Sequence, residues 1–333
     1  MIRTNSHMSF NKISNRDSYK RIDGRLNIFL GMCGYESRSR KMIEVVHAQK
    51  HASDKYFGLV FEEYKDLPET KESIAYYHEH GASIINVPYS DLVTSLDIII
   101  SSIATEKLPD IGLVVNIDIS SMPRYLYCSL PICLSKILNE IDSLILWYIP
   151  GEYIESDFPT AGISNLVLFS GKASLRPQKR AHIIGLGFDS IRSEGILTVI
   201  DPNYLITFYS NPSFTNEYTD RIKRDNKNML NRSELVIPLN IFDYESSLSK
   251  LISITKTLMK EYEVVLIPDG PKPFILLASL IPEFINIEGI ISLHVNSNRR
   301  DQKRYINVSA IGNPIGIAFE KSLNGRSLAI ASA

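Results

Sequence analysis

Two similar loops in the sequence combine glycines with arginines and carboxylates. The first runs from Gly31 to Arg40 and the second from Gly185 to Arg192. Their candidate ligand-binding residues are Gly34, Glu36, Arg38 and Arg40 in the first loop, and Gly187, Asp189 and Arg192 in the second. Arginine can hold a phosphate through two hydrogen bonds, and the start of the helix expected after each loop attracts anions. Both loops are therefore predicted to bind an anion. The alternative is that the carboxylates only cap the helices while the arginines are solvated.

Two proline-containing loops carry a second set of candidates. These are Asp118, Ser120, Ser121 and Arg124 in one loop, and Asp269, Gly270 and Lys272 in the other. Prolines stiffen a loop and so reduce the entropy that it loses when a ligand binds. We favour ligand binding here over the alternative of a stiff turn that only starts a helix.

Common catalytic and cofactor motifs are missing from the sequence. The run GMCGYE lacks the third glycine of a dinucleotide-binding fingerprint, and no Walker A lysine motif occurs. There is no G-x-S-x-G nucleophile motif, no HExxH zinc motif and no paired-cysteine spacing. We therefore predict no cofactor and no metal, and the sequence identifies no catalytic residue.

The elements that must position these loops are short apolar runs alternating with helical segments. The runs at 26–30, 56–61, 83–87, 113–119 and 144–149 are expected strands, with helices between them. Strands that alternate with helices indicate an α/β fold with a mostly parallel sheet. Ligands of such sheets bind beyond the carboxyl ends of the strands, where the candidate loops lie.

The same order of segments recurs about 150 residues later. GYESRSRKMIEVV from Gly34 corresponds to GFDSIRSEGILTVI from Gly187, and LVVNIDISSMPR from Leu113 to VVLIPDGPKPF from Val264. The sequence thus predicts two tandem Rossmann-like parallel-sheet units that arose by internal duplication. The expected boundaries are a flexible N-terminus at 1–24, unit 1 at 25–150, a linker or edge hairpin at 151–180, and unit 2 with a C-terminal edge extension at 181–333.

Composition narrows the range of partners. The 333 residues carry a formal net charge of -1, so the chain has no overall attraction to nucleic acid or anionic membranes. Nucleic acid could still contact a local basic patch, made of Arg299, Arg300, Lys303 and Arg304. No apolar stretch approaches the roughly 20 residues that span a bilayer, and no apolar secretion signal is present. We expect a cytoplasmic protein without a membrane partner.

The GYESRSR turn after the first strand and the DISSMPR turn after the fourth resemble the layout of CARF and SAVED sensor domains. The resemblance covers about residues 26–148 and 181–295. CARF and SAVED modules are Rossmann-like, bind cyclic nucleotides in prokaryotic antiviral systems and, in SAVED, occur as a fused pair. The resemblance implies a nucleotide bound between the two units. It also implies a separate effector protein or a homo-oligomer, because no effector domain is recognisable in the chain.

Three functions therefore remain open. The favoured one is a nucleotide-sensing or scaffold component of an antiviral defence system. The second is a nuclease or nucleoside glycosidase that draws its acids from Glu36, Asp118, Asp189 and Asp269. The third is a purely structural partner subunit. The sequence does not specify the ligand, the oligomeric state or the partner.

Overall fold

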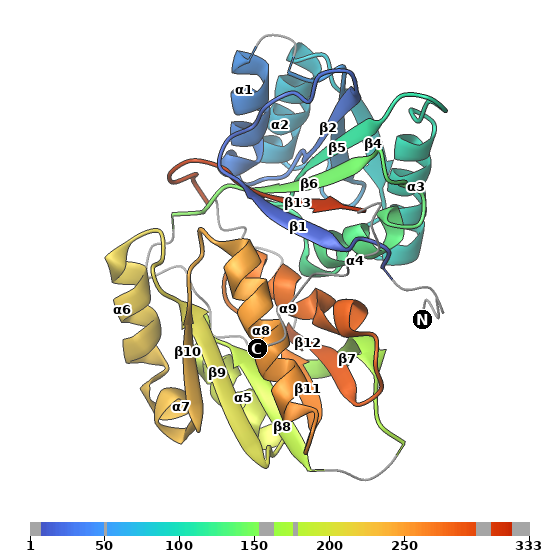
Figure 1. Cartoon of the computed structure of the whole chain (residues 1–333). Helices are drawn as coiled ribbons and strands as arrows, with labels where there is room; N and C mark the ends of the chain where they lie inside the picture. Colours follow the sequence, from blue (N-terminus) through green and yellow to red (C-terminus); the bar gives the residue numbers. More distant parts are fainter. Residues whose placement is uncertain (1–7, 50–51, 153–162, 176–178, 298–307, 322–333) are drawn as a thin grey trace. The chain divides into compact units, whose positions relative to one another are not determined.

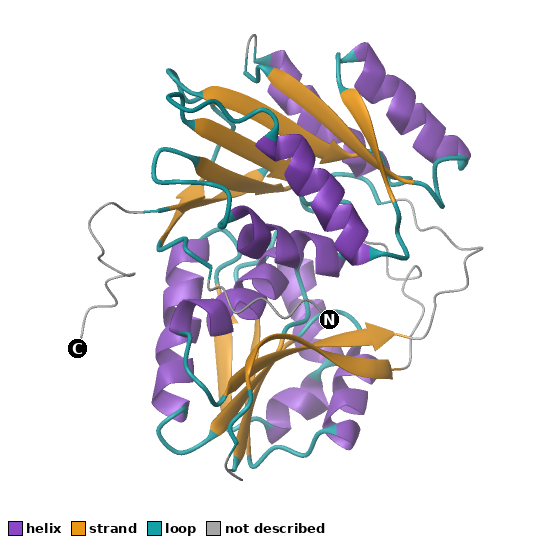
Figure 2. Cartoon of the chain, turned by 90° about the vertical axis from the view of Figure 1, so that its right-hand side faces the viewer, coloured by secondary structure: helices purple, strands orange, loops and turns teal. Residues whose placement is uncertain are grey.

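The computed structural model describes residues 8–49, 52–152, 163–175, 179–297 and 308–321. They form two compact units, of which the first comprises the described residues up to 152 together with 308–321, and the second comprises 163–297. Each unit is an α/β fold whose sheet has helices on both faces (Figures 1 and 2).

Unit 1 is built on a seven-stranded sheet with the order β1-β13-β6-β5-β2-β3-β4. Its strands are β1 (Lys12–Arg16), β2 (Leu26–Met32), β3 (Lys55–Phe61), β4 (Ser83–Val87), β5 (Leu113–Asp118), β6 (Ser143–Tyr148) and β13 (Ile315–Glu320). Strands β2 to β6 are mutually parallel, whereas β13 pairs antiparallel with both β6 and β1.

The helices of unit 1 follow the strands in alternation. They are the 3-10 helix η1 (Ser37–Arg40), α1 (Lys41–Ala48), α2 (Pro68–Glu79), α3 (Leu92–Ala104) and α4 (Arg124–Leu134). One core cluster joins α1 and α2 to the sheet through Met42, Val46, Tyr77 and the buried Trp147. Figure 1 shows α3 and α4 on the opposite face, where they pack against each other.

Unit 2 has a six-stranded sheet with the order β10-β9-β8-β11-β12-β7. The strands are β7 (Ile163–Lys172), β8 (Arg180–Gly185), β9 (Tyr204–Ser210), β10 (Leu235–Leu239), β11 (Glu263–Ile267) and β12 (Ile290–Ser297). The helices are α5 (Ser190–Val199), α6 (Asn216–Asp225), α7 (Lys227–Arg232), α8 (Tyr244–Leu258) and α9 (Lys272–Ile285). Helices α5 to α7 contribute Ile196, Ile222 and Met229 to one core cluster, while α8 and α9 contact each other.

The two units share one strand order. Numbered within each unit, the parallel strands run 3-2-1-4-5, which is the Rossmann order. The predicted pair of Rossmann-like units is therefore confirmed. A duplication would produce this repeated order, and the duplication itself stays a prediction.

Three predicted boundaries are wrong. The supposedly flexible segment 1–24 contains β1, and its Phe10, Ile13 and Tyr19 are buried in unit 1. The C-terminal strand β13 does not extend unit 2 but covers the β6 edge of unit 1. Segment 151–180, predicted as a linker or edge hairpin, contributes β7, an antiparallel edge strand that pairs with β12 of unit 2. The physical reason is that sheet edges expose unpaired backbone groups, and distant segments cover them.

Among the described residues, no helix combines the length and the apolarity needed to cross a bilayer.

Candidate functional site

The strand order brings the predicted loops together within each unit. In unit 1 the first strand β2 pairs directly with the fourth strand β5, and in unit 2 β8 pairs with β11. The chain leaves these two strands toward opposite sides of the sheet, so their carboxyl ends form the topological switch point at which open α/β sheets bind ligands. Each unit therefore contains one candidate site, which we describe separately.

The backbones of the two loops of unit 2 touch at a pair of glycines. A Cβ on Gly187 would stand 3.1 Å from the Cα of Gly270, and a Cβ on Gly270 would stand 2.6 Å from the carbonyl oxygen of Leu186. Gly270 also has φ +93°, a conformation that side chains disfavour. Only glycine at position 270 allows the loops to approach this closely, which leaves their backbone groups near one another at the sheet edge.

An ion pair joins the same two loops. Arg192 Nε donates to Asp269 Oδ2 at 2.9 Å, and Arg192 Nη2 contacts the same oxygen. The Asp269 carboxylate raises the pKa of Arg192 above its ordinary value, against the opposing effect of burial. The other carboxylate oxygen of Asp269 accepts from the Gly270 backbone N–H at 2.9 Å. Asp269 and Arg192 thus hold each other in place, with Asp269 3% exposed.

Asp189 is the N-cap of α5. Its side chain accepts from the backbone N–H of Arg192 at 3.0 Å, which occupies the start of that helix with a carboxylate. For Asp189, the helix-cap alternative stated above is the one that the structure shows. An added anion would be repelled by this carboxylate, so the start of α5 is a poor phosphate site.

The start of α9 has the opposite character. The helix begins at Lys272 after Pro271, with no side-chain cap and no acidic residue in its first turn. A lysine at a helix N-terminus adds positive charge to the positive end of the helix dipole. This end of α9 is consequently an electropositive position, and it closely follows Gly270 in the chain.

In unit 1 the loops meet through Glu36. The Glu36 carboxylate accepts from Arg38 Nε at 2.6 Å and from Ser121 Oγ at 3.3 Å. Arg38 is only 2% exposed, so its guanidinium is committed to a buried ion pair. The C-terminal segment closes over this loop, since the carbonyl of Val308 accepts from the backbone N–H of Arg38 at 3.2 Å. Sequence reasoning missed Val308, because nothing local links positions 38 and 308.

Arg40 and Ser120 both have partners within unit 1, and their predicted role in ligand binding stays a prediction. Arg40 pairs with Glu72 at 3.6 Å and lies over the ring of Tyr76, both on α2 and not in the fourth-strand loop. Ser120 is buried, and its hydroxyl donates to Asp118 Oδ1 at 2.5 Å while accepting from the Ile149 N–H at 2.8 Å. The Asp118–Ser120 contact therefore stabilises the turn after β5 from within.

Arg124 is the unit 1 counterpart of Lys272. It is the first residue of α4 and follows Pro123; the N-cap of this helix makes no side-chain hydrogen bond, and its first turn contains no acidic residue. Gly34 lies close by in the first-strand loop, where an added Cβ would be 3.6 Å from the Cβ of Ser121. Both units thus start the helix after the fourth strand with proline followed by a cation.

Cys33, which lies immediately before Gly34, does not offer a reactive thiolate. Burial raises the pKa of its thiol to about 12, which keeps the sulfur protonated at neutral pH.

Some predictions concern parts or arrangements that the structure does not address. The basic patch of Arg299, Arg300, Lys303 and Arg304 lies outside the described residues. A pocket shared by both units also stays a prediction.

Sequence reasoning overlooked the aromatic residues at the same edge. Phe188 follows Gly187 directly and packs edge-on against Tyr218 of α6, with ring centroids 5.3 Å apart. Arg221 lies over the Phe188 ring at 4.5 Å. A phenylalanine or tyrosine within four residues of the end of each of the first three parallel strands of a unit was the signal that could have revealed them.

No protein-family model matches the chain, and no curated protein matches it. Solved structures with some similarity include AtPrR2 in apo form, with 12% identity over 72% of this chain and 88% of that chain and a TM-score of 0.24. AtPrR2 with NADP+ and (+)pinoresinol gives 11% identity over 69% and 83%, with a TM-score of 0.25. An O-GlcNAc transferase mutant of Thermobaculum terrenum gives 10% identity over 81% and 54%, with a TM-score of 0.22. At these scores the similarity carries no argument about the ligand or activity of this chain.

Proposed function

We propose that this chain binds a phosphorylated ligand of the nucleotide class at the carboxyl edge of its sheets, and that it acts as a nucleotide sensor or scaffold. The proposal rests on the charges and backbone geometry at the start of α9. Lys272 and the start of α9 follow the touching glycines Gly187 and Gly270, and the first turn of this helix contains no acidic residue. The helix dipole and a cation together favour a phosphate.

The charges around Arg124 support the same proposal for unit 1. Arg124 places a cation on the first residue of α4, beside the positive end of the helix dipole, and both would attract a phosphate. Because a proline followed by a cation also begins α9, coincidence is a weaker explanation of the arrangement at α4.

The carboxylates favour binding over catalysis. Glu36 pairs with Arg38, Asp269 pairs with Arg192, and Asp189 caps α5. Asp118 accepts from both the backbone and the hydroxyl of Ser120. A general acid or base needs a carboxylate that can exchange protons with a substrate, whereas these four candidates hold the loops together.

The proposed biological role is a sensing component of a prokaryotic antiviral defence system that passes its signal to a separate effector protein or to another copy of the chain. This role rests on the resemblance of the GYESRSR and DISSMPR turns to CARF and SAVED domains. Size-exclusion chromatography with and without the bound nucleotide tests the partner, since a sensor of this kind changes its assembly when it binds.

Calorimetry with the purified full chain tests ligand binding. The ligands are linear mononucleotides, cyclic mononucleotides and cyclic dinucleotides, and the variants are Lys272→Ala and Arg124→Ala. Each should weaken binding about tenfold or more, because a hydrogen bond to a charged group contributes about 1.5–3 kcal/mol.

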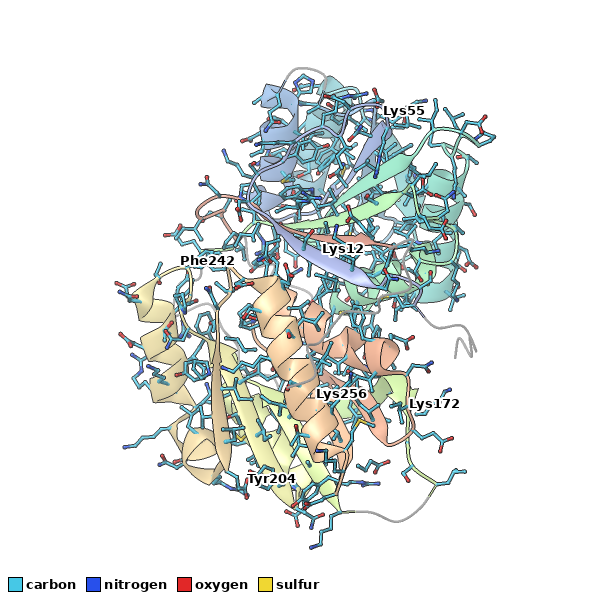
Figure 3. The ribbon with its side chains drawn as sticks, in the orientation of Figure 1. Lys12, Lys55, Lys172, Tyr204, Phe242 and Lys256 are labelled. Carbon is cyan, nitrogen blue, oxygen red and sulfur yellow. The ribbon has the colours of Figure 1, made fainter. Side chains whose placement is uncertain are left out.

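Lys256→Ala and Lys136→Ala are the matched controls, since both lysines are exposed and lie near the far ends of α8 and α4 (Lys256 is labelled in Figure 3). They should leave the affinity unchanged. Absence of binding by the wild-type chain would contradict the proposal and favour a structural subunit. Rapid consumption of one nucleotide would instead favour an enzyme.

A further inference from the structure

A row of aromatic rings lies along the carboxyl edge of unit 2. Phe188 follows β8, Phe214 follows β9 and Phe242 follows β10. Because the strand order is β10-β9-β8-β11, these loops succeed one another along the sheet edge and end beside the β11 loop that leads to Lys272. An electropositive helix start is thus followed, strand by strand, by three phenylalanines.

The outer two rings pack edge-on and are partly open to solvent. Phe214 and Phe242 have ring centroids 5.2 Å apart and an interplanar angle of 80°. The side chain of Phe242 is 42% exposed, so the pair does not simply extend the core. The solvent-exposed part of the Phe242 ring is accessible to a stacking partner.

Backbone hydrogen bonds hold these loops in position. The N–H of Asn211 donates to the Leu239 carbonyl at 2.8 Å, which ties the β9 loop to β10. The N–H of Phe242 donates to Asn240 Oδ1 at 2.9 Å, and Asp243 then caps α8. The rings are therefore positioned before any ligand arrives, which lowers the entropic cost of stacking.

Unit 1 has an aromatic cluster at the equivalent place. Phe61 ends β3, and Tyr64 and Tyr89 lie 6.3 and 5.1 Å from it, measured between ring centroids. Tyr89 is 49% exposed. The carboxylate of Glu63 accepts from the Tyr89 N–H at 2.7 Å and so fixes the loop.

The loops after the third parallel strands, β4 and β10, show the equivalence between the two units most clearly. Tyr89 precedes Asp91, the N-cap of α3, much as Phe242 precedes Asp243, the N-cap of α8. A single exposed aromatic side chain is ordinary on a protein surface. Exposed aromatic rings therefore occur at the same topological position in both units.

We propose that Phe214 and Phe242 form a stacking platform for a nucleobase whose phosphate lies at the start of α9. The inference rests on the proposed phosphate site at Lys272. Strand β9, which precedes Phe214, lies two strand spacings from β11, about 10 Å, and β10, which precedes Phe242, lies three spacings away, about 14 Å. The bound nucleotide must therefore span roughly this distance between its phosphate and its base. Stacking on phenylalanine uses the face of the base and not its hydrogen-bonding edge, so the platform accepts purines and pyrimidines alike.

Titration calorimetry of the full chain with ATP, CTP and inorganic tripolyphosphate tests the platform. The wild-type chain should bind both nucleotides about tenfold or more tightly than tripolyphosphate, since stacking on an aromatic side chain is worth roughly that much. Phe242→Ala should remove most of this preference and leave tripolyphosphate binding unchanged. Phe242→Tyr, which keeps a ring, should retain the preference.

Tyr204→Ala is the matched control. Tyr204 also has an aromatic partner, Tyr262 at 5.7 Å, but it begins β9 and lies at the opposite end of unit 2 from Phe242 (Figure 3). It should leave all three affinities unchanged.

The possible failures can be told apart. Equal affinity of the wild-type chain for tripolyphosphate and the nucleotides would overturn the platform while the phosphate site stands. An equal loss of affinity for all three ligands in Phe242→Ala would also overturn the platform, because the ring would then support the loops and not the base. Absence of binding by all three ligands would overturn the platform together with the phosphate site on which it rests.

Discussion

The guanidinium of Arg192 and the carboxylate of Asp269 connect the helix after the first strand of unit 2 to the loop after its fourth strand, with an Nε–Oδ2 distance of 2.9 Å. The two residues are 77 positions apart in the sequence. Asp269 is buried, and the Arg192 side chain is 18% exposed. Good geometry lets the two charges of a buried ion pair stabilise each other. Removing one of them strongly destabilises the fold, because the other charge is left buried without a counterion.

Arg192→Ala should lower the free energy of unfolding of unit 2 by about 2–3 kcal/mol, because it leaves the buried Asp269 carboxylate without its cation. Urea denaturation followed by circular dichroism measures the loss. Arg224→Ala is the control, since Arg224 is 63% exposed in its pair with Asp225 and should cost less than about 1 kcal/mol. Equal losses in the two variants would contradict a stabilising role of the buried pair.

Gly270→Ala should destabilise the chain more than Gly289→Ala. Both glycines have positive φ, +93° and +89°, so both substitutions carry backbone strain. Only at Gly270 would the new Cβ also meet backbone, 2.6 Å from the Leu186 oxygen, whereas Gly289 has nothing within 4 Å. We expect about 1 kcal/mol for Gly289→Ala and about 2 kcal/mol more for Gly270→Ala, measured by urea denaturation. Equal denaturation midpoints for Gly270→Ala and Gly289→Ala would show that the close contact between the two loops does not contribute to stability.

Ser120→Ala should cost about 1–3 kcal/mol of stability, because it leaves the buried Ile149 N–H without its acceptor. Ser121→Ala should cost less, since Ser121 is half-buried and its hydrogen bond to Glu36 is long, at 3.3 Å. The fluorescence of Trp147 reports on unit 1, because it is the sole tryptophan of the sequence and lies buried in β6. A larger loss of stability in Ser121→Ala than in Ser120→Ala would contradict the stabilising role of the Ser120 hydroxyl.

Unit 2 should lose stability as the pH falls from about 6.5 to about 4. His182 is fully buried in β8, and within the described residues neither ring nitrogen has a hydrogen-bond partner. Burial, helped by the charge of Arg180, lowers its pKa to about 4 from 6.5. Between these values the unfolded chain binds a proton that the folded chain does not, so acidification favours unfolding.

Thermal unfolding between pH 4 and pH 8 measures this dependence. His182→Leu should flatten the profile in this window, because it removes the titrating group. His182→Gln should also flatten it while lowering stability at every pH, since a buried amide remains without partners. An unchanged slope in both variants would assign the acid sensitivity to other groups.

Local sequence signals were sufficient to predict the strands and the loops that carry the candidate site. The apolar run 113–119 predicted β5, every residue of which is buried, because a strand covered on both faces is almost continuously apolar. The turns at Gly34 and Gly187 follow the first strands as expected, since glycine and strand-end signals act over a few residues.

The partners of those segments were decided only by the tertiary structure. Strand β13 pairs with β6 of unit 1, although its position in the sequence pointed to unit 2. Unpaired backbone groups at every sheet edge are chemically alike, so the sequence of a strand does not specify which edge it joins. The same holds for side chains: Arg38 binds Glu36 while Arg192 binds Asp269, and Phe214 meets Phe242, because sheet order and loop path set which groups come within a few ångströms. Residue types at strand ends establish which chemistry is possible, and the order of the strands determines which of those residues act together.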